Sequence, residues 1–323
     1  MRILLVKLSS MGDVLHNLPV VTDLARAYPD IEIDWVTEAS YAGLVGLHSA
    51  VHQVFSMPLR GLKNRWWSPA AWTSFSDAKA QLGCRKYDLI LDTQGLIKSA
   101  LIARLVEGPI AGFSRDTARE SLAARFYDRH VAVSRDLHAV ERNRRLAAGI
   151  FGYELSGLVD YGLRLPAVAQ STKPAHPYVV FLHATSRADK MWPEPNWIAL
   201  GQRFHESGNY VLLPWGSAEE KRVSERLASA IPGAVVTPAM SLVEAAAVLA
   251  GARSVVGVDT GLAHLAVALA RPTVGLYLTT SPALTGLCGN ELAINLGGGT
   301  RQQPVVPSVD EAWHALQSLL AGK

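Results

Sequence analysis

The chain has 323 residues, of which 49% are hydrophobic and 18% are charged, a composition that excludes intrinsic disorder. A domain usually contains about 100–200 residues, so the length predicts two domains, each with its own core. The net charge of +3 and the isoelectric point near 8.8 argue against a nucleic-acid-binding protein, which usually carries a concentrated basic face.

Short apolar runs alternate with longer helical patterns, which predicts βαβ units and parallel sheets. In the first half, the expected strands are 3–8, 31–37, 52–56, 88–92 and 109–113, and the expected helices are 14–28, 39–47, 96–107 and 139–151. A second cycle follows the polar stretch 165–177, with strands expected at 178–183, 210–213, 235–236, 254–258 and 273–278.

We therefore expect one Rossmann-like domain at 1–165 and another at 175–323. The last helix, at about 308–321, packs on either of them. Ligands of such sheets bind at the carboxyl ends of the strands, so two half-sites are expected to face each other across a cleft.

The two cysteines, Cys84 and Cys288, form neither a CxxC pair nor a cluster with histidines at zinc spacing. This pattern predicts a reducing compartment and no structural metal. The start of the chain lacks the layout of a cleaved signal, and every apolar stretch is too short to span a membrane. No G-x-G-x-x-G follows the first strand and no P-loop motif occurs, which argues against a classical dinucleotide or P-loop nucleotide site.

The first polar loop follows the first expected strand and contains Ser9, Ser10, Gly12 and Asp13. Its small residues let a ligand approach the backbone closely. Asp13 is either a helix N-cap, since aspartate accepts hydrogen bonds from the amides of a first turn, or a general base.

The second loop follows the first strand of the second half and contains Thr185, Ser186 and Lys190. Two hydroxyls and a lysine at the carboxyl end of a strand suit an oxyanion such as a diphosphate. The alternative for Lys190 is an exposed loop residue.

The third loop, Asp259-Thr260-Gly261, leads from a buried strand into a helix. The unpaired amides of that helix start favour an anion, and they favour it more strongly together with Lys190. His264, four residues after Thr260, either faces the same ligand or packs in the core.

A fourth strand-to-helix turn contains Glu220, which either accepts ribose hydroxyls or is a surface charge at a helix start. Met240, after a short strand, either packs against an adenine ring or fills a gap in the core.

The first three loops, together and in this order, resemble those of the lipopolysaccharide heptosyltransferase family, over nearly the whole chain. Within that family, the first loop is most similar to the heptosyltransferase I branch. The resemblance implies a GT-B fold, an ADP-heptose donor bound by the second domain and a Kdo2-lipid A acceptor bound by the first. It further implies an inverting reaction, with neither a metal ion nor a cofactor, that adds the first heptose of the inner core. A heptosyltransferase II or III, or another GT-B transferase with a different acceptor, is the alternative.

Site residues follow from the resemblance by position. Asp13 is the expected base and Lys190 the second catalytic residue. The expected donor contacts are Thr185, Ser186, Lys190, Glu220, Met240, Asp259, Thr260, Gly261 and His264. The expected acceptor contacts are Ser10, Gly12, Arg60, Lys63, Gln94, Lys98 and Arg119. Thr185-Ser186 stands where relatives have a Thr-Thr pair, and the segment 60–67 departs from the family pattern.

The charge is unevenly distributed, since residues 60–145 contain 16 Lys and Arg against 9 Asp and Glu. Arg60, Lys63 and Arg65 precede Trp66, Trp67 and Trp72. Basic residues beside tryptophans suit an anionic membrane surface, unless the tryptophans are buried in the core. Together with this pattern, the resemblance implies a protein peripheral to the cytoplasmic face of the inner membrane. We also expect a monomer. A non-catalytic lipid A-binding protein and a nucleotide-sugar epimerase remain as the competing functions.

Overall fold

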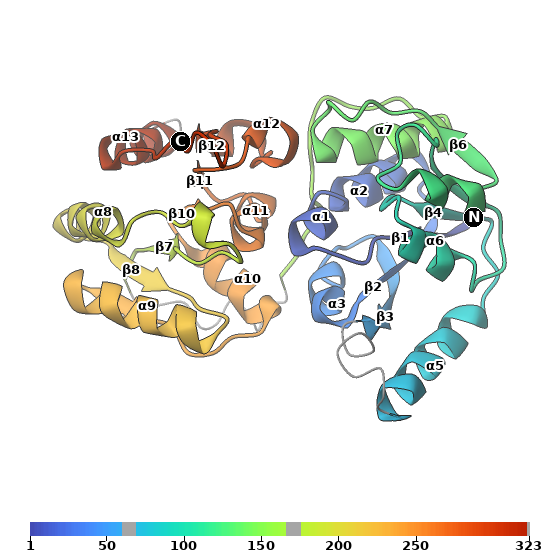
Figure 1. The fold of residues 1–323 in the computed structure, drawn as a ribbon, viewed down its shortest axis with the longest axis horizontal. Coiled ribbons are helices and arrows are strands. Elements are labelled where there is room, and N and C mark those ends of the chain that lie inside the picture. Colours follow the sequence, from blue (N-terminus) through green and yellow to red (C-terminus); the bar gives the residue numbers. More distant parts are fainter. Residues whose placement is uncertain (60–68, 166–175, 322–323) are drawn as a thin grey trace. The chain divides into compact units, whose positions relative to one another are not determined.

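The computed structural model describes residues 1–59, 69–165 and 176–321. The chain divides into two compact units, Met1–Arg164 and Leu165–Lys323 (Figure 1). Arg60, Lys63, Arg65, Trp66 and Trp67 lie outside the described residues.

Unit 1 is built on a parallel sheet in which the first strand is central, with the order β3-β2-β1-β4-β5-β6. Its strands are β1 (Arg2–Val6), β2 (Glu32–Glu38), β3 (Val51–Met57), β4 (Leu89–Asp92), β5 (Ile110–Phe113) and β6 (Arg129–Val131). Its helices are α1 (Met11–Leu15), α2 (Leu18–Ala27), α3 (Ala39–Val45), α5 (Pro69–Gly83), α6 (Ile97–Ala103) and α7 (Ala139–Phe151), with a 3-10 helix η1 (Ser121–Phe126).

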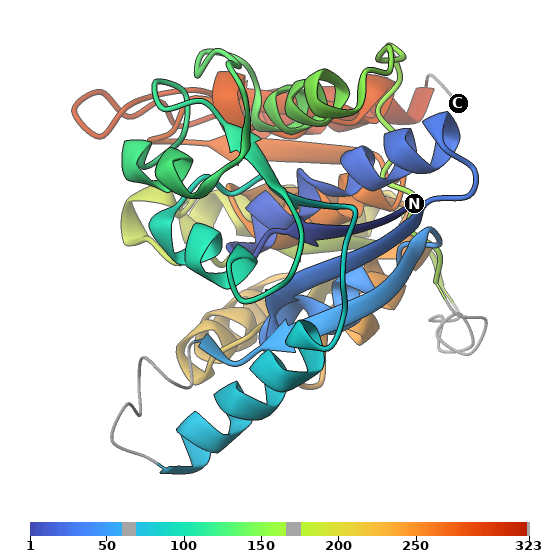
Figure 2. The ribbon, with the colours of Figure 1, turned by 90° about the vertical axis from the view of Figure 1, so that its right-hand side faces the viewer.

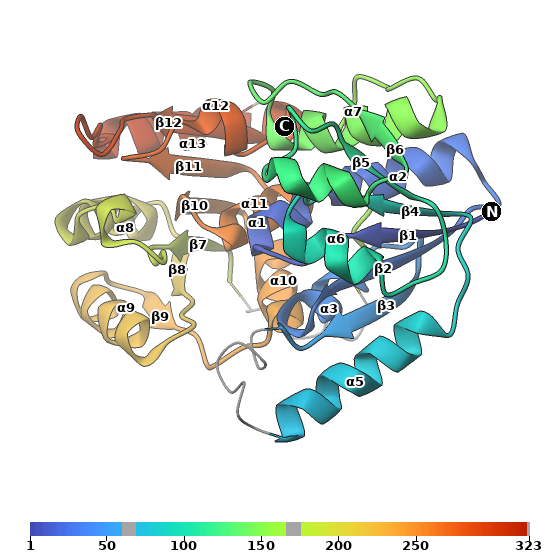
Figure 3. The same cartoon turned by 45° about the vertical axis from the view of Figure 1, so that its right-hand side comes forward.

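Helices cover both faces of this sheet because β1 is apolar on both. Leu4 and Val6 join a core cluster with residues of α5, α6 and η1. Helices α2 and α7 pack against each other (Figure 2), and α6 lies beside η1 (Figure 3). A strand buried on both faces is typical of parallel sheets, which explains the uninterrupted apolar run at the start of the chain.

Unit 2 repeats the same topology, with the parallel order β12-β11-β10-β7-β8-β9. Its strands are β7 (Tyr178–Leu182), β8 (Tyr210–Leu213), β9 (Ala234–Val236), β10 (Ser254–Val258), β11 (Thr273–Tyr277) and β12 (Ala293–Gly297). Its helices are α8 (Glu194–Glu206), α9 (Ala218–Ala230), α10 (Leu242–Gly251), α11 (Gly261–Ala268), α12 (Pro282–Thr285) and α13 (Val309–Ala321), with short 3-10 helices η3 (Ala188–Lys190) and η4 (Asn290–Leu292).

The last helix, α13, packs against α8, β11 and β12. Ala312, Leu316 and Leu319 enter the unit 2 core together with Trp197 and Phe204. The sequence left open whether this helix packs on the first or the second domain, and the contacts of α13 in the structure are with unit 2.

The ten expected strands are present, with ends within two residues of their predicted positions. The single helix expected at 14–28 is wrong, because the structure has α1 and α2 with a break at His16-Asn17. Pro19 lies in the first turn of α2, where its missing N–H is tolerated, whereas in a continuous helix it would remove a bond to the carbonyl of Leu15. The sequence interpretation also missed α5 and the edge strands β6 and β12, which carry exposed or half-buried side chains.

Within the described part of the chain, no helix is both long enough and apolar enough to cross a membrane.

A buried ion pair joins α2 to α7. Arg144 is 2% exposed, and its guanidinium donates two hydrogen bonds to Asp23, of 2.7 and 3.0 Å. Both charges have lost their hydration, so each depends on the other.

We expect Asp23→Ala to lower the free energy of unfolding of unit 1 by about 3–5 kcal/mol, because it leaves a buried guanidinium without its partner. The double variant Asp23→Leu/Arg144→Met removes both charges and should cost less than the single change. Urea unfolding followed by circular dichroism measures both values. A double variant less stable than Asp23→Ala would contradict this interpretation of the pair.

Candidate active site

The polar loops identified in the sequence lie at the same place in each sheet. In unit 1 the strand order reverses between β1 and β4, and in unit 2 between β7 and β10. Loops that leave the carboxyl ends of two such strands diverge to opposite sides and leave a crevice, which is where open α/β sheets bind ligands. The segments that follow β1, β4, β7 and β10 carry Asp13, Gln94, Lys190 and Asp259, respectively.

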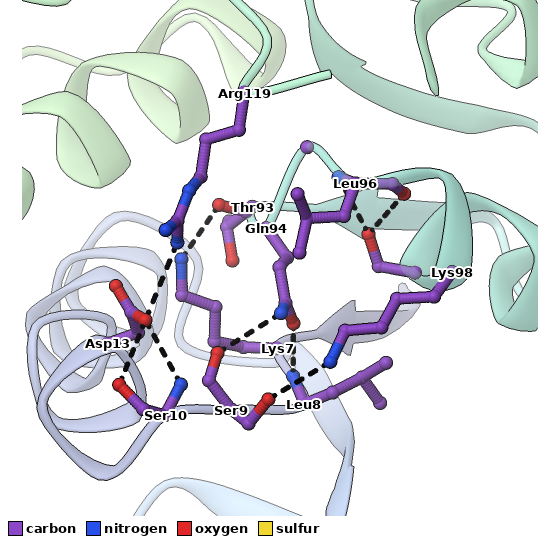
Figure 4. Close-up of polar contacts among 12 residues, drawn as sticks. Lys7, Leu8, Ser9, Ser10, Asp13, Thr93, Gln94, Leu96, Lys98 and Arg119 are labelled. Carbon is purple, nitrogen blue, oxygen red and sulfur yellow. Dashed lines mark hydrogen bonds and ion pairs between the residues drawn. The ribbon is translucent and has the colours of Figure 1, made fainter. Parts of the chain in front are cut away.

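Asp13 does not occupy the N-cap position of α1, but its carboxylate takes part in capping that helix, so the helix-start alternative describes part of its contacts. The N-cap is Ser10, and Asp13 lies three residues into the helix. Its Oδ2 atom accepts hydrogen bonds from the backbone N–H of Ser10, at 3.0 Å, and from its hydroxyl, at 3.1 Å (Figure 4). Gly12, expected in the loop after the first strand, lies inside α1.

Positive charges surround the Asp13 carboxylate. The guanidinium Nη1 of Arg119 lies 3.5 Å from Oδ2, and Lys7 lies at the end of β1 on the same side (Figure 4). Burial raises the pKa of Asp13, but the charges of Lys7 and Arg119 and the hydrogen bonds from Ser10 outweigh burial. The pKa of Asp13 therefore lies below its usual value, and the group is an ionised carboxylate at neutral pH.

Gln94 binds the first loop directly. Its Oε1 accepts the N–H of Leu8 at 2.7 Å, and its Nε2 donates to the carbonyl of Ser9 at 3.1 Å (Figure 4). Lys98 donates to the Ser9 hydroxyl at 3.2 Å. The side chain of Gln94 is 2% exposed, so its amide positions the loop, whereas Lys98 is accessible to a ligand.

Asp92 in turn fixes the loop that carries Gln94. One carboxylate oxygen accepts the N–H groups of Gln94 and Gly95, and the other accepts the hydroxyls of Ser99 and Tyr127. Burial raises the pKa of Asp92. Four donors on one buried carboxylate hold the loop in a single arrangement.

Two basic residues of this region, Lys7 and Arg142, were missed by the sequence interpretation. Lys7 is 4% exposed, and its ammonium donates to the Thr93 carbonyl at 2.8 Å. Arg142, on α7, donates to the Thr117 carbonyl at 2.8 Å and lies over the ring of Phe113. The sequence feature that could have identified Lys7 is its position directly after an apolar strand.

In unit 2, Lys190 and Asp259 form an ion pair of 2.5 Å. The same Asp259 oxygen accepts the hydroxyl of Thr280 at 2.9 Å, and the Asp259 carbonyl accepts that of Thr185 at 3.1 Å. Lys190 is therefore held over the loop after β10, and the exposed-residue alternative for it is wrong. Ser186, in the segment after β7 that also carries Lys190, is exposed. Thr280, after β11, was not identified from the sequence.

Helix α11 begins at Gly261, with Thr260 as its N-cap. The first amides of a helix have no acceptor within it, so those of Gly261 and Leu262 are available to an anion at the end of β10. His264 is only 5% exposed. Its burial favours the interpretation as a core residue.

Glu220 caps the start of α9. Its Oε2 accepts the N–H of Gly216 at 2.6 Å and that of Ser217 at 3.2 Å. The helix-start alternative thus describes its contacts, and a ribose would have to be bound by its other oxygen. Met240 is half-buried, between β9 and α10.

A second ionic cluster follows the same edge of unit 2 and was also missed. Asp189 accepts hydrogen bonds from Arg187, from Thr279 at 3.2 Å and from Arg301 at 3.1 Å. The hydrogen bond from Arg187 is the main reason that the pKa of Asp189 is lowered to about 2.

Within residues 1–59, 69–165 and 176–321, no group of three His, Cys, Asp or Glu side chains is arranged to hold a metal ion.

Two doubly wound units, one with an ionised carboxylate and one with a lysine beside a helix start, have the features of a nucleotide-sugar transferase, and comparison with known proteins identifies the family. The model of glycosyltransferase family 9 (heptosyltransferase) matches residues 77–312. The chain is 46% identical to lipopolysaccharide heptosyltransferase 1 of Pseudomonas aeruginosa, over 92% of this chain and 84% of that protein. The chain therefore belongs to glycosyltransferase family 9, the heptosyltransferases.

Solved structures agree with this assignment. The E. coli heptosyltransferase WaaC with ADP superposes with a TM-score of 0.89 at 39% identity, covering 99% of this chain and 100% of that one. WaaC with ADP-2-deoxy-2-fluoro heptose superposes with a TM-score of 0.86 at 38% identity, covering 98% and 99% of the two chains. The predicted GT-B fold and the predicted glycosyltransferase activity are confirmed.

We expect Gln94→Glu to lower turnover by about tenfold, because a carboxylate in place of the amide nitrogen removes the hydrogen bond to the Ser9 carbonyl and repels that oxygen. Steady-state rates of glycosyl transfer measure the effect. Gln303→Glu, at an exposed position in unit 2, is the matched control. Equal rates for the two variants would show that Gln94 does not position the loop.

Proposed function

We propose that the chain transfers L-glycero-D-manno-heptose from ADP-heptose to a Kdo hydroxyl of Kdo2-lipid A, the first heptose of the lipopolysaccharide inner core. The observation that carries this proposal is the ionised Asp13, which follows β1 where the strand order of unit 1 reverses and which is held by Ser10 and Arg119. It occurs in a chain 46% identical to a lipopolysaccharide heptosyltransferase 1. Asp13 supplies the base, and unit 2 supplies the donor contacts.

The donor contacts proposed for unit 2 follow from its charges. Lys190 and the amides at the start of α11 interact with the diphosphate of ADP-heptose, and the exposed Ser186 offers a hydroxyl to it. Structures of WaaC with ADP and with a fluorinated ADP-heptose support a donor of this kind. The remaining predicted donor residues are Thr185, Glu220, Met240, Asp259, Thr260, Gly261 and His264.

The acceptor contacts proposed for unit 1 are basic and surround Asp13. Lys98 and Arg119 are exposed beside Ser9 and Asp13 and suit the carboxylate and phosphate groups of an anionic glycolipid. Ser10 and Gly12 allow close approach, and Gln94 positions the loop. The predicted acceptor contacts Arg60 and Lys63 lie outside the described residues and are proposed from the sequence alone. We propose that the enzyme acts as a monomer at the cytoplasmic face of the inner membrane, where basic residues and tryptophans of 60–72 contact anionic lipid.

Transfer is then a single displacement. Asp13 accepts the proton of the Kdo hydroxyl while the hydroxyl oxygen forms a bond to the anomeric carbon of heptose. The bond between that carbon and the diphosphate oxygen breaks, its electron pair leaves with ADP, and the anomeric configuration inverts. The charge that develops on ADP is stabilised by Lys190 and by the amides of Gly261 and Leu262 at the start of α11, and the reaction needs no metal ion.

We expect Asp13→Asn to lower kcat by about 10²–10⁴, because the amide has the shape of the carboxylate but cannot accept the proton. Affinity for ADP, measured by isothermal titration calorimetry, should be unchanged, since Asp13 belongs to unit 1. Turnover close to that of the unsubstituted enzyme would exclude Asp13 as the base.

Mass spectrometry of the lipid product tests the whole proposal. With ADP-heptose and Kdo2-lipid A in excess EDTA, we expect the lipid to gain the mass of one heptose. ADP-glucose and UDP-sugars should give little product. A gain only without chelator would overturn the metal-free step, a preference for another donor would overturn the substrate, and no gain with any donor would favour a lipid-binding protein.

A further inference from the structure

Lys7 is a buried charged group to which the proposed reaction assigns no role. It follows β1, is 4% exposed, and donates from Nζ to the carbonyl of Thr93 at 2.8 Å. In the part of the chain that the structure describes, its ammonium has no carboxylate at ion-pair distance. A neutral carbonyl does not compensate for the lost hydration of an ammonium, so the charge must be balanced over a longer distance.

Two carboxylates and two guanidinium groups face Lys7 from the elements around it. The carboxylates are Asp13 on α1 and Asp92 on β4, and the guanidiniums are Arg119, which follows β5, and Arg142 on α7. Asp92 already accepts four hydrogen bonds from its own loop. Figure 4 shows the Lys7 ammonium beside the Asp13 carboxylate, which is therefore the counter-charge of Lys7 whose hydrogen bonds are not committed to that loop.

Lys7 in turn lowers the pKa of Asp13. Among the interactions that oppose the effect of burial on Asp13, the charge of Lys7 is larger than the hydrogen bonds from Ser10 and larger than the charge of Arg119. Arg119 is also half-exposed, so solvent screens it, whereas Lys7 is enclosed.

We propose that Lys7 is a positioning residue that keeps Asp13 ionised in the resting enzyme, through its charge and without exchanging a proton. The inference rests on the proposed role of Asp13 as the base. After Asp13 has accepted the acceptor's proton, the nearby ammonium favours release of that proton to solvent, which restores the carboxylate for the next cycle.

The pKa values of Lys7 and Asp13 determine which limb of the pH profile depends on Lys7. Burial lowers the pKa of Lys7 to about 8, so its charge is present below that pH and lost above it. Above pH 8, Asp13 is ionised with or without Lys7. Loss of Lys7 should therefore change only the acid limb of the pH profile, where Asp13 takes up a proton.

The test compares variants that remove or keep the charge. Lys7→Met removes the charge, Lys7→Gln removes it but retains an N–H donor for Thr93, and Lys7→Arg keeps it. Lys86→Met removes an exposed lysine that pairs with Glu107 and is the matched control. We expect the acid limb of kcat/KM to move up by about one pH unit in Lys7→Met and Lys7→Gln, and to stay in place in Lys7→Arg and Lys86→Met.

A direct titration separates this inference from the proposed function. The carboxylate ¹³C resonance of Asp13, assigned by its loss in Asp13→Asn, gives the pKa of that group without any substrate. A raised pKa in Lys7→Gln supports the inference, and an unchanged pKa in a variant that still binds ADP overturns it. If the pKa rises while the acid limb stays in place, Lys7 controls Asp13 as inferred, but Asp13 is not the base.

Discussion

The parallel strand order of the two sheets is the constraint on which the site depends. In each unit the first strand is central, and the chain reverses its direction of winding beside it, between β1 and β4 and between β7 and β10. Parallel strands end at one edge, so loops distant in sequence meet there. Leu8 and Gln94, 86 residues apart, share a hydrogen bond for this reason. Lys190 and Asp259 meet in the same way in unit 2.

Hydrogen bonds within unit 1 convert this topology into a rigid site. Asp92 holds the loop of Gln94, Gln94 holds Leu8 and Ser9, and Ser10 holds Asp13. Each of these hydrogen bonds replaces solvent by a fixed donor or acceptor, so Asp13, as the proposed base, would need little reorganisation during the reaction. The cationic surroundings of Asp13 keep its carboxylate ionised, and in the proposed function they would also attract an anionic acceptor.

The sequence predicted the strands well because strands buried on both faces are marked by continuous apolar runs, and it located the loops because small and polar residues end those runs. It did not predict β6 or β12, whose edge positions leave side chains half-buried or exposed. The roles of Gln94 and Lys7 could not be predicted, since their partners lie 86 residues away. Asp13 was identified as a candidate, but its place after the N-cap depends on where α1 begins, and helix ends are weakly encoded locally.

The central claim is a single displacement at the anomeric carbon with Asp13 as base. The anomeric configuration of the new heptose-Kdo linkage, determined from the one-bond carbon–hydrogen coupling of the purified product, tests it most directly. A single displacement gives a configuration opposite to that in ADP-heptose. Retention of the donor configuration would require an intermediate that one base and one leaving group do not provide, and would contradict the account.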